Sequence, residues 1–184
     1  MYRLMIYLLI ALCTLGCVPA IHSYYAPISS DGKVINAACT FVAPRDTIEF
    51  KPSGIRIRLR GGEKSVLLTL RIPKGITVQL NTSRMLIVQS GKSFEYQLEE
   101  FHYSESSRQR ITVPADSKLI GGEFLLGSGT VISRDYDSWI RFDNLIGTDF
   151  EVQLPKMHIG LDEIQLPLIK FERKIGFGIY PINC

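Results

Sequence analysis

Ile55-Arg56-Ile57-Arg58-Leu59-Arg60 alternates apolar and basic residues, and Gly61-Gly62 ends the run. The next segment, residues 66–72, repeats the alternation, with apolar residues at positions 66, 68, 70 and 72, and stops at Pro73. Side chains on a β-strand point to opposite faces in turn, so this period of two predicts strands with one buried face and one solvated face. The two runs therefore predict half-buried antiparallel strands.

The same alternation recurs along the chain and is separated by turn residues. Further runs lie at residues 76–80, 94–98, 150–154 and 175–179, and turns are expected at 51–54, 73–75, 90–91 and 121–122. The phase slips at Glu99-Glu100, which indicates a β-bulge, and residues 157–166 predict a tight hairpin. Sustained helical periodicity is absent after residue 33. We therefore expect one all-β domain over residues 34–184, an antiparallel β-sandwich.

The first residues have the three-part pattern of a secretory signal. Arg3 supplies a positive charge, an apolar run extends from Leu4 to Leu15, and small residues and Pro19 follow it. The run is shorter than the ~20 apolar residues that a membrane-spanning helix usually needs. Export from the cytoplasm is therefore expected.

Thr14-Leu15-Gly16-Cys17 resembles the lipobox of bacterial lipoproteins. Gly16 and Cys17 fit the motif, and Thr14 departs from it because the family usually has Leu there. The resemblance implies a signal peptide over 1–16, lipidation of Cys17, a tether over 17–33 and a place in the outer membrane facing the periplasm. The alternatives are cleavage after Ala20, which gives a soluble periplasmic or secreted protein, and an uncleaved anchor.

Cys39 and Cys184 are the cysteines that remain after lipidation or removal of Cys17. A pair of cysteines in an oxidising compartment predicts a disulfide. Neither has the spaced Cys or His partners of a zinc site, so no metal and no cofactor is expected.

The charge balance excludes one class of partner. The chain carries 21 basic and 18 acidic side chains, and removal of residues 1–16 takes away Arg3 alone, which leaves a net charge of +2. Nucleic-acid binding calls for a clustered basic face, so no nucleic-acid partner is expected. Arg56, Arg58 and Arg60, with Arg71 and Lys74 nearby, are interpreted as a solvated strand face rather than a cationic binding patch.

Residues 133–139 form the richest candidate loop. Asp135 and Asp137, with Asp143 and Asn144 nearby, could supply oxygens to calcium, and Trp139 could stack on a sugar or anchor a partner, although Trp139 is expected in the core. Ser90-Gly91-Lys92-Ser93 is read as a hairpin turn, because the first glycine of a phosphate-binding loop is missing. The three histidines lack spaced metal partners, and His102 near Ser104 is not in itself a catalytic arrangement.

The leading hypothesis is a non-enzymatic, lipid-anchored envelope protein that contacts the membrane through its anchor and binds an unidentified envelope component. The alternatives are an envelope hydrolase acting on glycan or lipid, and a calcium or small-ligand binding module. Placement of His102 within hydrogen-bond reach of a serine or carboxylate in a pocket would favour the hydrolase.

Overall fold

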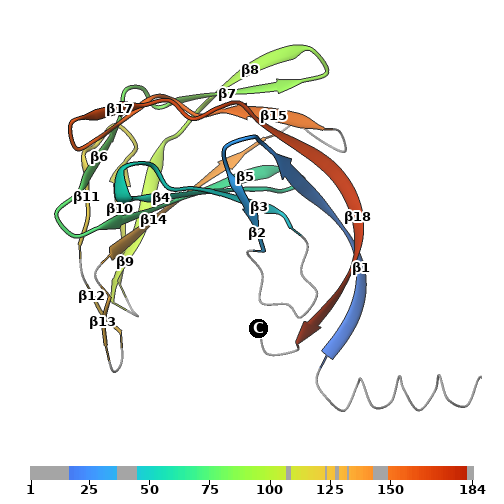
Figure 1. The fold of residues 1–184 in the computed structure, drawn as a ribbon, viewed down its shortest axis with the longest axis horizontal. Coiled ribbons are helices and arrows are strands. Elements are labelled where there is room, and N and C mark those ends of the chain that lie inside the picture. The colour runs from blue at the N-terminus through green and yellow to red at the C-terminus, as the bar shows by residue number, and fades with distance from the viewer. Residues whose placement is uncertain are drawn as a thin grey trace, which may run out of the picture.

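The computed structural model describes residues 17–36, 45–106, 109–122, 124–126, 129–131, 133–142 and 149–181. Within these ranges the chain is almost entirely β-strand, every strand pair is antiparallel, and one short 3-10 turn, η1 (Pro52–Gly54), is present. The predicted all-β, antiparallel, sandwich-like single domain is confirmed (Figure 1).

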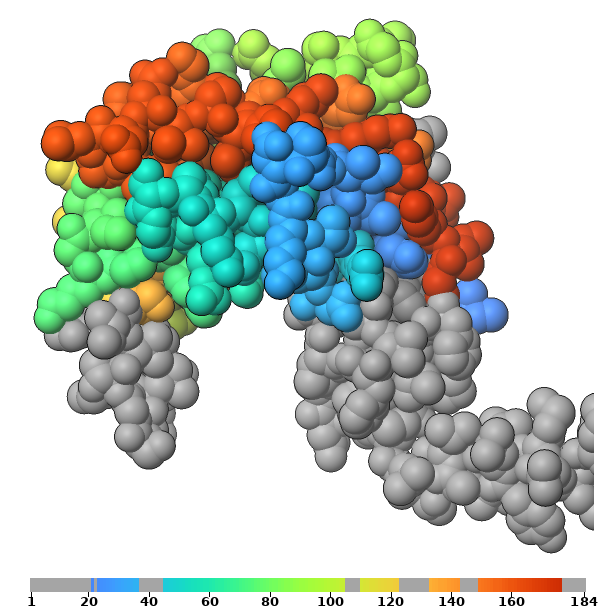
Figure 2. All heavy atoms as spheres, viewed as in Figure 1, coloured from blue at the N-terminus to red at the C-terminus, as the bar shows by residue number. Residues whose placement is uncertain are grey.

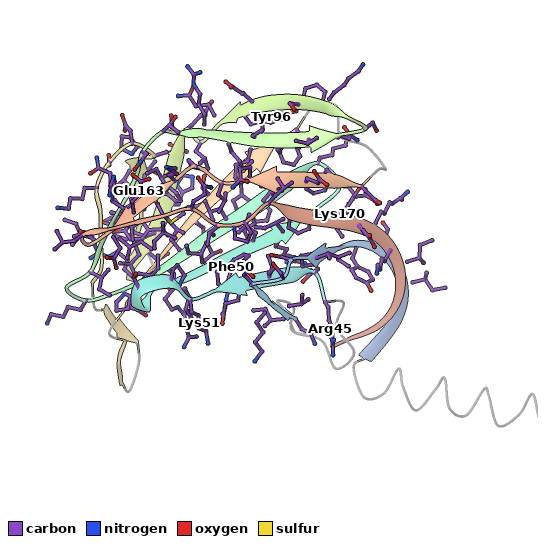
Figure 3. The ribbon with its side chains drawn as sticks, turned by 45° about the horizontal axis from the view of Figure 1, so that its top comes forward. Arg45, Phe50, Lys51, Tyr96, Glu163 and Lys170 are labelled. Carbon is purple, nitrogen blue, oxygen red and sulfur yellow. The ribbon has the colours of Figure 1, made fainter. Side chains whose placement is uncertain are left out.

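Sheet A has five strands. In spatial order they are β1 (Cys17–Ile28), β18 (Ile169–Pro181), β15 (Phe150–Gln153), β7 (Arg84–Gln89) and β8 (Lys92–Gln97). The long β1–β18 ribbon forms one edge and the β7–β8 hairpin forms the other, where Figure 3 labels Lys170 and Tyr96 respectively.

Sheet B has seven strands. In spatial order they are β10 (Gln109–Pro114), β9 (Glu100–Ser106), β14 (Ser133–Arg141), β5 (Ser65–Pro73), β4 (Arg56–Gly61), β3 (Thr47–Phe50) and β2 (Lys33–Ile35). Ile57, Leu59, Val66, Leu68, Leu70 and Ile72 are buried, and the residues that alternate with them in β4 and β5 are not, so the predicted alternation is confirmed here. A separate two-stranded sheet is formed by β12 (Phe124–Leu126) and β13 (Gly129–Val131).

Sheet C continues the layer of sheet A. Its strands, in spatial order, are β11 (Leu119–Ile120), β6 (Thr77–Leu80), β16 (Met157–Ile159) and β17 (Asp162–Ile164). Three strands of sheet C are joined in the chain to strands of sheet A: β6 to β7, β16 to β15 and β17 to β18. The joined strands lie in the same order in both sheets. Pro155 and Pro167 interrupt the ladder between the two sheets because proline lacks an N–H donor. Gln153 and Gln165 donate side-chain hydrogen bonds to the carbonyls of Leu166 (2.8 Å) and Leu154 (3.0 Å) at this break.

The core lies between sheets A and C on one side and sheet B on the other. A Cβ on Gly61 of β4 would lie 2.7 Å from the Phe171 ring of β18 and 3.0 Å from the Cβ of Tyr25 on β1, so the layers approach closely there. Phe142, which follows β14, contacts Phe150 of β15 with ring centroids 6.2 Å apart. In Figure 2 the orange-to-red end of the chain lies across the teal strands β3 and β4, which shows one layer covering the other.

The tether expected over residues 17–33 is instead largely a strand. Residues 17–28 form β1 and pair with β18 along their whole length. Tyr25 is 1% exposed and packs against Phe150 with ring centroids 5.2 Å apart. The prolines in this segment misled the prediction, because an edge strand tolerates a missing N–H on its open side.

The expected bulge at Glu99-Glu100 is a crossing between layers. β8 ends at Gln97 in sheet A and β9 begins at Glu100 in sheet B, which explains the change of phase. The hairpin predicted over 157–166 is confirmed, since Ile159 pairs with Asp162 and Gly160 takes a φ of 62° in the turn. Ser90 and Gly91 form the predicted turn between β7 and β8.

Candidate functional site

An open groove lies where β9 and β14 diverge in sheet B. Among the described residues, the ladder between these strands has the single register pair Asp137 and His102. The groove has a volume of about 830 Å³, and residues of β8 also line it. Its lining residues are Tyr96, Gln97, Glu99, Glu100, His102, Arg110, Ser138, Trp139, Ile140 and Arg141. We call this feature the Trp139 groove.

Trp139 is the only tryptophan of the chain and is 55% exposed. The alternate residues Tyr136, Ser138 and Ile140 of β14 are buried, so the odd-numbered residues face outward. The expectation that Trp139 belongs to the core is therefore wrong. In the apolar pair Trp139-Ile140, Ile140 lies in the core and Trp139 faces outward. A half-exposed indole offers apolar aromatic surface to a ligand.

His102 connects two other side chains at the groove. Its Nε2 lies 3.1 Å from Oε1 of Glu100, and its Nδ1 lies 2.9 Å from Oγ1 of Thr112. Glu100 and His102 are two residues apart on β9, and Thr112 is the cross-strand partner of His102 on β10. The regular geometry of the β9–β10 ladder is sufficient to bring the three together.

Charged side chains of both signs line the groove. Glu99 and Glu100 contribute two carboxylates, and Arg110 and Arg141 contribute two guanidinium groups. On the side of β8, Tyr96 packs edge-on against Phe142 with ring centroids 5.0 Å apart. This contact with the buried Phe142 holds the Tyr96 ring at the margin of the groove.

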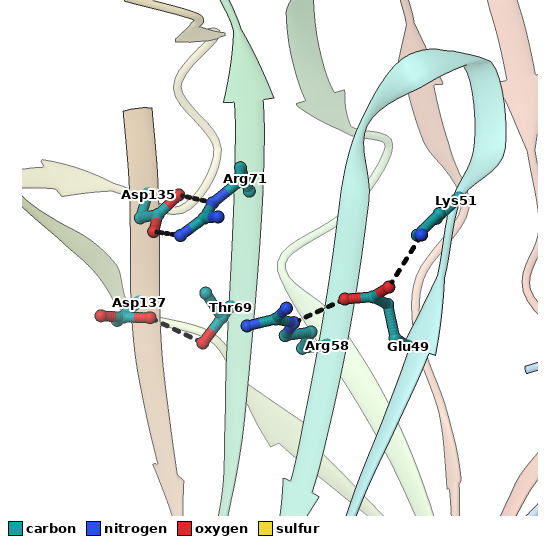
Figure 4. A network of polar contacts seen from close by, with 7 residues as sticks. All are labelled: Glu49, Lys51, Arg58, Thr69, Arg71, Asp135 and Asp137. Atoms are coloured by element: carbon teal, nitrogen blue, oxygen red, sulfur yellow. Dashed lines mark hydrogen bonds and ion pairs between the residues drawn. The ribbon is translucent and has the colours of Figure 1, made fainter. Parts of the chain in front are cut away.

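Asp135 and Asp137 lie on β14 rather than in a loop, and their oxygens already accept hydrogen bonds (Figure 4). Arg71 donates to both oxygens of Asp135, from Nε at 2.6 Å and from Nη2 at 2.5 Å, and Thr69 Oγ1 donates to Asp137 at 2.7 Å. Across the described residues, no group of three His, Cys, Asp or Glu side chains could hold a metal. The calcium alternative therefore gains no support from this geometry.

Two of the three strand β4 arginines form ion pairs with acids on or beside β3. Arg58 Nε lies 2.7 Å from Glu49, and Arg60 Nε lies 2.7 Å from Asp46. Both acids are buried, whereas the arginines are partly exposed. Charge neutralisation of this kind agrees with a solvated strand face and leaves little excess positive charge for an acidic partner.

Several predicted site residues lie outside the described residues. These are Cys39, Cys184, Asp143 and Asn144. Cys17 is described by its backbone, as the first residue of β1 opposite Pro181. Lipidation and the disulfide therefore stay predictions.

Most of the groove was not predicted from the sequence. Trp139 and His102 were considered separately, whereas Tyr96, Glu99, Arg110 and Arg141 carried no motif. These residues come from β8, the β8–β9 crossing, β10 and β14. Sequence spacing could not reveal the site, because the order in which strands pair decides which of them meet.

Comparison with protein-family models, curated proteins and solved structures finds no match to this chain. Among the residues that the structure describes, none of the helical segments is long and apolar enough to span a bilayer.

Proposed function

We propose that this protein is a non-enzymatic, lipid-anchored protein of the bacterial cell envelope, whose sandwich binds another envelope component in the Trp139 groove. The signal-like N-terminus and Gly16-Cys17 support export and anchoring at Cys17 in the outer membrane, facing the periplasm. The half-exposed Trp139, placed in an open groove among polar side chains, is the observation that carries the binding function.

A tryptophan at the surface favours binding over a purely structural role. Tryptophan is enriched among the residues that dominate binding energy, and ligand sites combine aromatic surface with a small number of polar groups. Residues 135, 137 and 141, on the same outward face of β14, are charged, so Trp139 breaks an otherwise polar row.

Site-specific photo-crosslinking in intact cells tests the binding function. A photoreactive benzoylphenylalanine in place of Trp139 keeps an aromatic side chain in the groove, and the same group in place of Leu161 serves as the control. Leu161 is fully exposed in the β16–β17 turn, on sheet C rather than in the groove. We expect a discrete adduct from position 139 and none from position 161. Equal labelling from both positions, or from neither, would exclude a partner in the groove.

Anchoring is tested separately. Cys17→Ala should abolish incorporation of labelled palmitate and release the protein from the membrane fraction. Membrane association of the wild type without label would contradict lipidation and favour an uncleaved anchor.

One observation favours a second candidate, a hydrolase. His102 lies between a carboxylate and a hydroxyl in a groove, which is the minimal relation of a base, its orienting acid and a nucleophile. We prefer the binding function because Glu100, His102 and Thr112 are neighbours in the β9–β10 ladder. Regular strand pairing alone therefore brings them together. Turnover of glycan or ester substrates by the wild type, lost in both His102→Asn and Thr112→Val, would reverse this preference.

A further inference from the structure

The Trp139 groove offers a ligand one apolar surface and four charged groups that sum to zero. The exposed indole supplies the flat surface, and Glu99, Glu100, Arg110 and Arg141 supply two negative and two positive charges. A ligand that fits must be flat and apolar on one side and must carry both hydrogen-bond donors and acceptors at its rim.

The groove has equal numbers of positive and negative side chains, so polyanions are not its best ligands. Nucleic acids, phosphorylated lipids and acidic peptides bind where Lys and Arg are in excess, because affinity then comes from charge neutralisation. The two carboxylates in this groove would repel such ligands as strongly as the two guanidinium groups attract them. A strongly cationic ligand fails for the same reason.

Hydroxyl groups can use all four charged side chains. A hydroxyl donates a hydrogen bond to a carboxylate and accepts one from a guanidinium group, and hydrogen bonds to charged groups are stronger than neutral ones. A sugar ring carries such hydroxyls around its rim and C–H groups on its faces, which can stack on an indole. A polyhydroxylated ring therefore matches both parts of the groove.

One of the acids is already held in position. The contact of Glu100 with His102 at 3.1 Å, and of His102 with Thr112 at 2.9 Å, restricts the Glu100 carboxylate before any ligand arrives. Holding a binding group in place beforehand reduces the conformational entropy lost on binding.

We infer that the Trp139 groove binds a neutral saccharide chain, stacked on Trp139 and hydrogen-bonded by the surrounding carboxylates and guanidinium groups. This inference rests on the proposed function, because it names the ligand class of the same groove.

The single tryptophan makes the test direct. The full chain, purified in detergent micelles, is titrated with the neutral probes chitohexaose (N-acetylated) and maltohexaose and with a heparin hexasaccharide as a polyanion of similar length. A neutral probe should change the Trp139 emission saturably and lower its acrylamide quenching, because stacking covers part of the exposed ring. The heparin probe should cause no such change.

Variants connect the signal to the groove. Arg110→Ala and Arg141→Ala should each weaken binding about tenfold, the usual effect of losing a hydrogen bond from a charged group. Arg84→Ala is the matched control, because Arg84 is an exposed arginine on β7 that pairs with Glu95 outside the groove. Trp139→Ala should abolish binding by calorimetry while its circular dichroism stays that of the wild type.

The outcomes separate the inference from the proposed function. If the neutral probes leave Trp139 unchanged while crosslinking through position 139 still captures a partner, the saccharide inference is wrong and the binding function stands; an extended peptide is then the ligand class to examine. Preferential binding of the heparin probe would also overturn the inference. If saccharides bind in vitro and crosslinking captures nothing in cells, the inference stands and the proposed function loses its support.

Discussion

At the scale of single residues, burial separates the ion pairs that contribute to stability from those that contribute little. The pairs beside β4 include buried acids. Glu49 is 6% exposed and lies 2.7 Å from Arg58 and 3.3 Å from Lys51. Arg71 and Asp135, by contrast, are both more than a third exposed, so solvent screens their attraction. The sequence predicted the arginine face but not its partners, because the pairing of β3 with β4 cannot be read from spacing alone.

Glu49→Gln should lower the free energy of unfolding at neutral pH by about 1.5–3 kcal/mol, the range for a hydrogen bond to a charged group. Burial raises the pKa of Glu49, but the hydrogen bonds and charges of Arg58 and Lys51 outweigh it and lower that pKa below its ordinary value of 4.5. The stabilisation is therefore present above the unfolded pKa and is lost as the pH falls through the lowered folded pKa.

Urea unfolding of both proteins across the acid range measures this effect. The difference between wild type and Glu49→Gln should close as the pH falls from about 5 to about 2. Glu95→Gln is the control, since Glu95 is well exposed at 3.3 Å from Arg84 and should change stability by less than ~0.5 kcal/mol. A difference that is constant with pH would show that Glu49 acts through packing and not through its charge.

At the scale of elements, the edge strand β1 shows where alternation fails as a predictor. Its inward face is buried at Tyr25 and Pro27 but exposed at Ile21, so one face of the strand changes environment along its length. Strands β4 and β5 are covered throughout and keep a regular pattern of burial. Period two is a reliable signal only where the opposite layer covers the whole strand.

Tyr25→Ala tests whether residues 17–28 belong to the folded domain. Loss of a fully buried aromatic side chain should lower the free energy of unfolding by about 3–5 kcal/mol. Ile21→Ser, on the same face of β1 but 79% exposed, should change it by less than ~0.5 kcal/mol. Thermal and urea unfolding of the two variants provides the measurement. If both variants changed the free energy of unfolding by equally small amounts, residues 17–28 would be a tether and not part of the folded domain.

The β7–β8 turn was correctly predicted from the sequence, and its backbone conformation can be tested by substitution. Ser90 and Gly91 take φ values of 49° and 75°, as both central residues of a type I′ hairpin turn must. Gly91→Ala should lower the free energy of unfolding by about 1–2 kcal/mol, because a Cβ is unfavourable at positive φ. Among the described residues, no atom beyond the two chain neighbours lies within 4 Å of that Cβ, so the loss would come from the backbone alone.

The companion variant is Ser90→Asn, which should leave the stability unchanged or raise it slightly, because Asn-Gly is the preferred pair for this turn. Thermal unfolding of both variants checks the two effects. A stabilising Gly91→Ala would show that the turn adopts another conformation in solution.

At the scale of the whole molecule, the class of fold was predictable and the arrangement of its sheets was not. Repeated period-two runs and short turns are sufficient to indicate an antiparallel sandwich. The continuation of sheet A into sheet C depends on Gln153, Gln165, Pro155 and Pro167, whose roles appear only after the strands are paired. The groove depends on the divergence of β9 from β14, which is also a property of pairing.

The antiparallel β1–β18 ribbon relates the expected anchor to the expected disulfide. Cys17 lies opposite Pro181, and Cys184 follows Pro181 by three residues, a reach of at most ~10 Å. A disulfide needs Cα atoms about 4.4–6.8 Å apart, so the length of chain after Pro181 allows Cys184 to meet an unmodified Cys17. A lipid on the Cys17 sulfur removes that competition. Lipidation and the Cys39–Cys184 bridge are therefore coupled predictions.

Peptide mapping by mass spectrometry, without reduction and after alkylation of free thiols, tests the pair in protein extracted from membranes. We expect a linked Cys39–Cys184 peptide and a lipid-modified Cys17 peptide. Cys39→Ser should lower the free energy of unfolding by about 2–5 kcal/mol, as removal of a native disulfide typically does. A Cys17–Cys184 link in the wild type would contradict both predictions at once, because the same sulfur cannot carry a lipid and a disulfide. An alkylated Cys184 beside a lipidated Cys17 would contradict the bridge alone and leave the anchor in place.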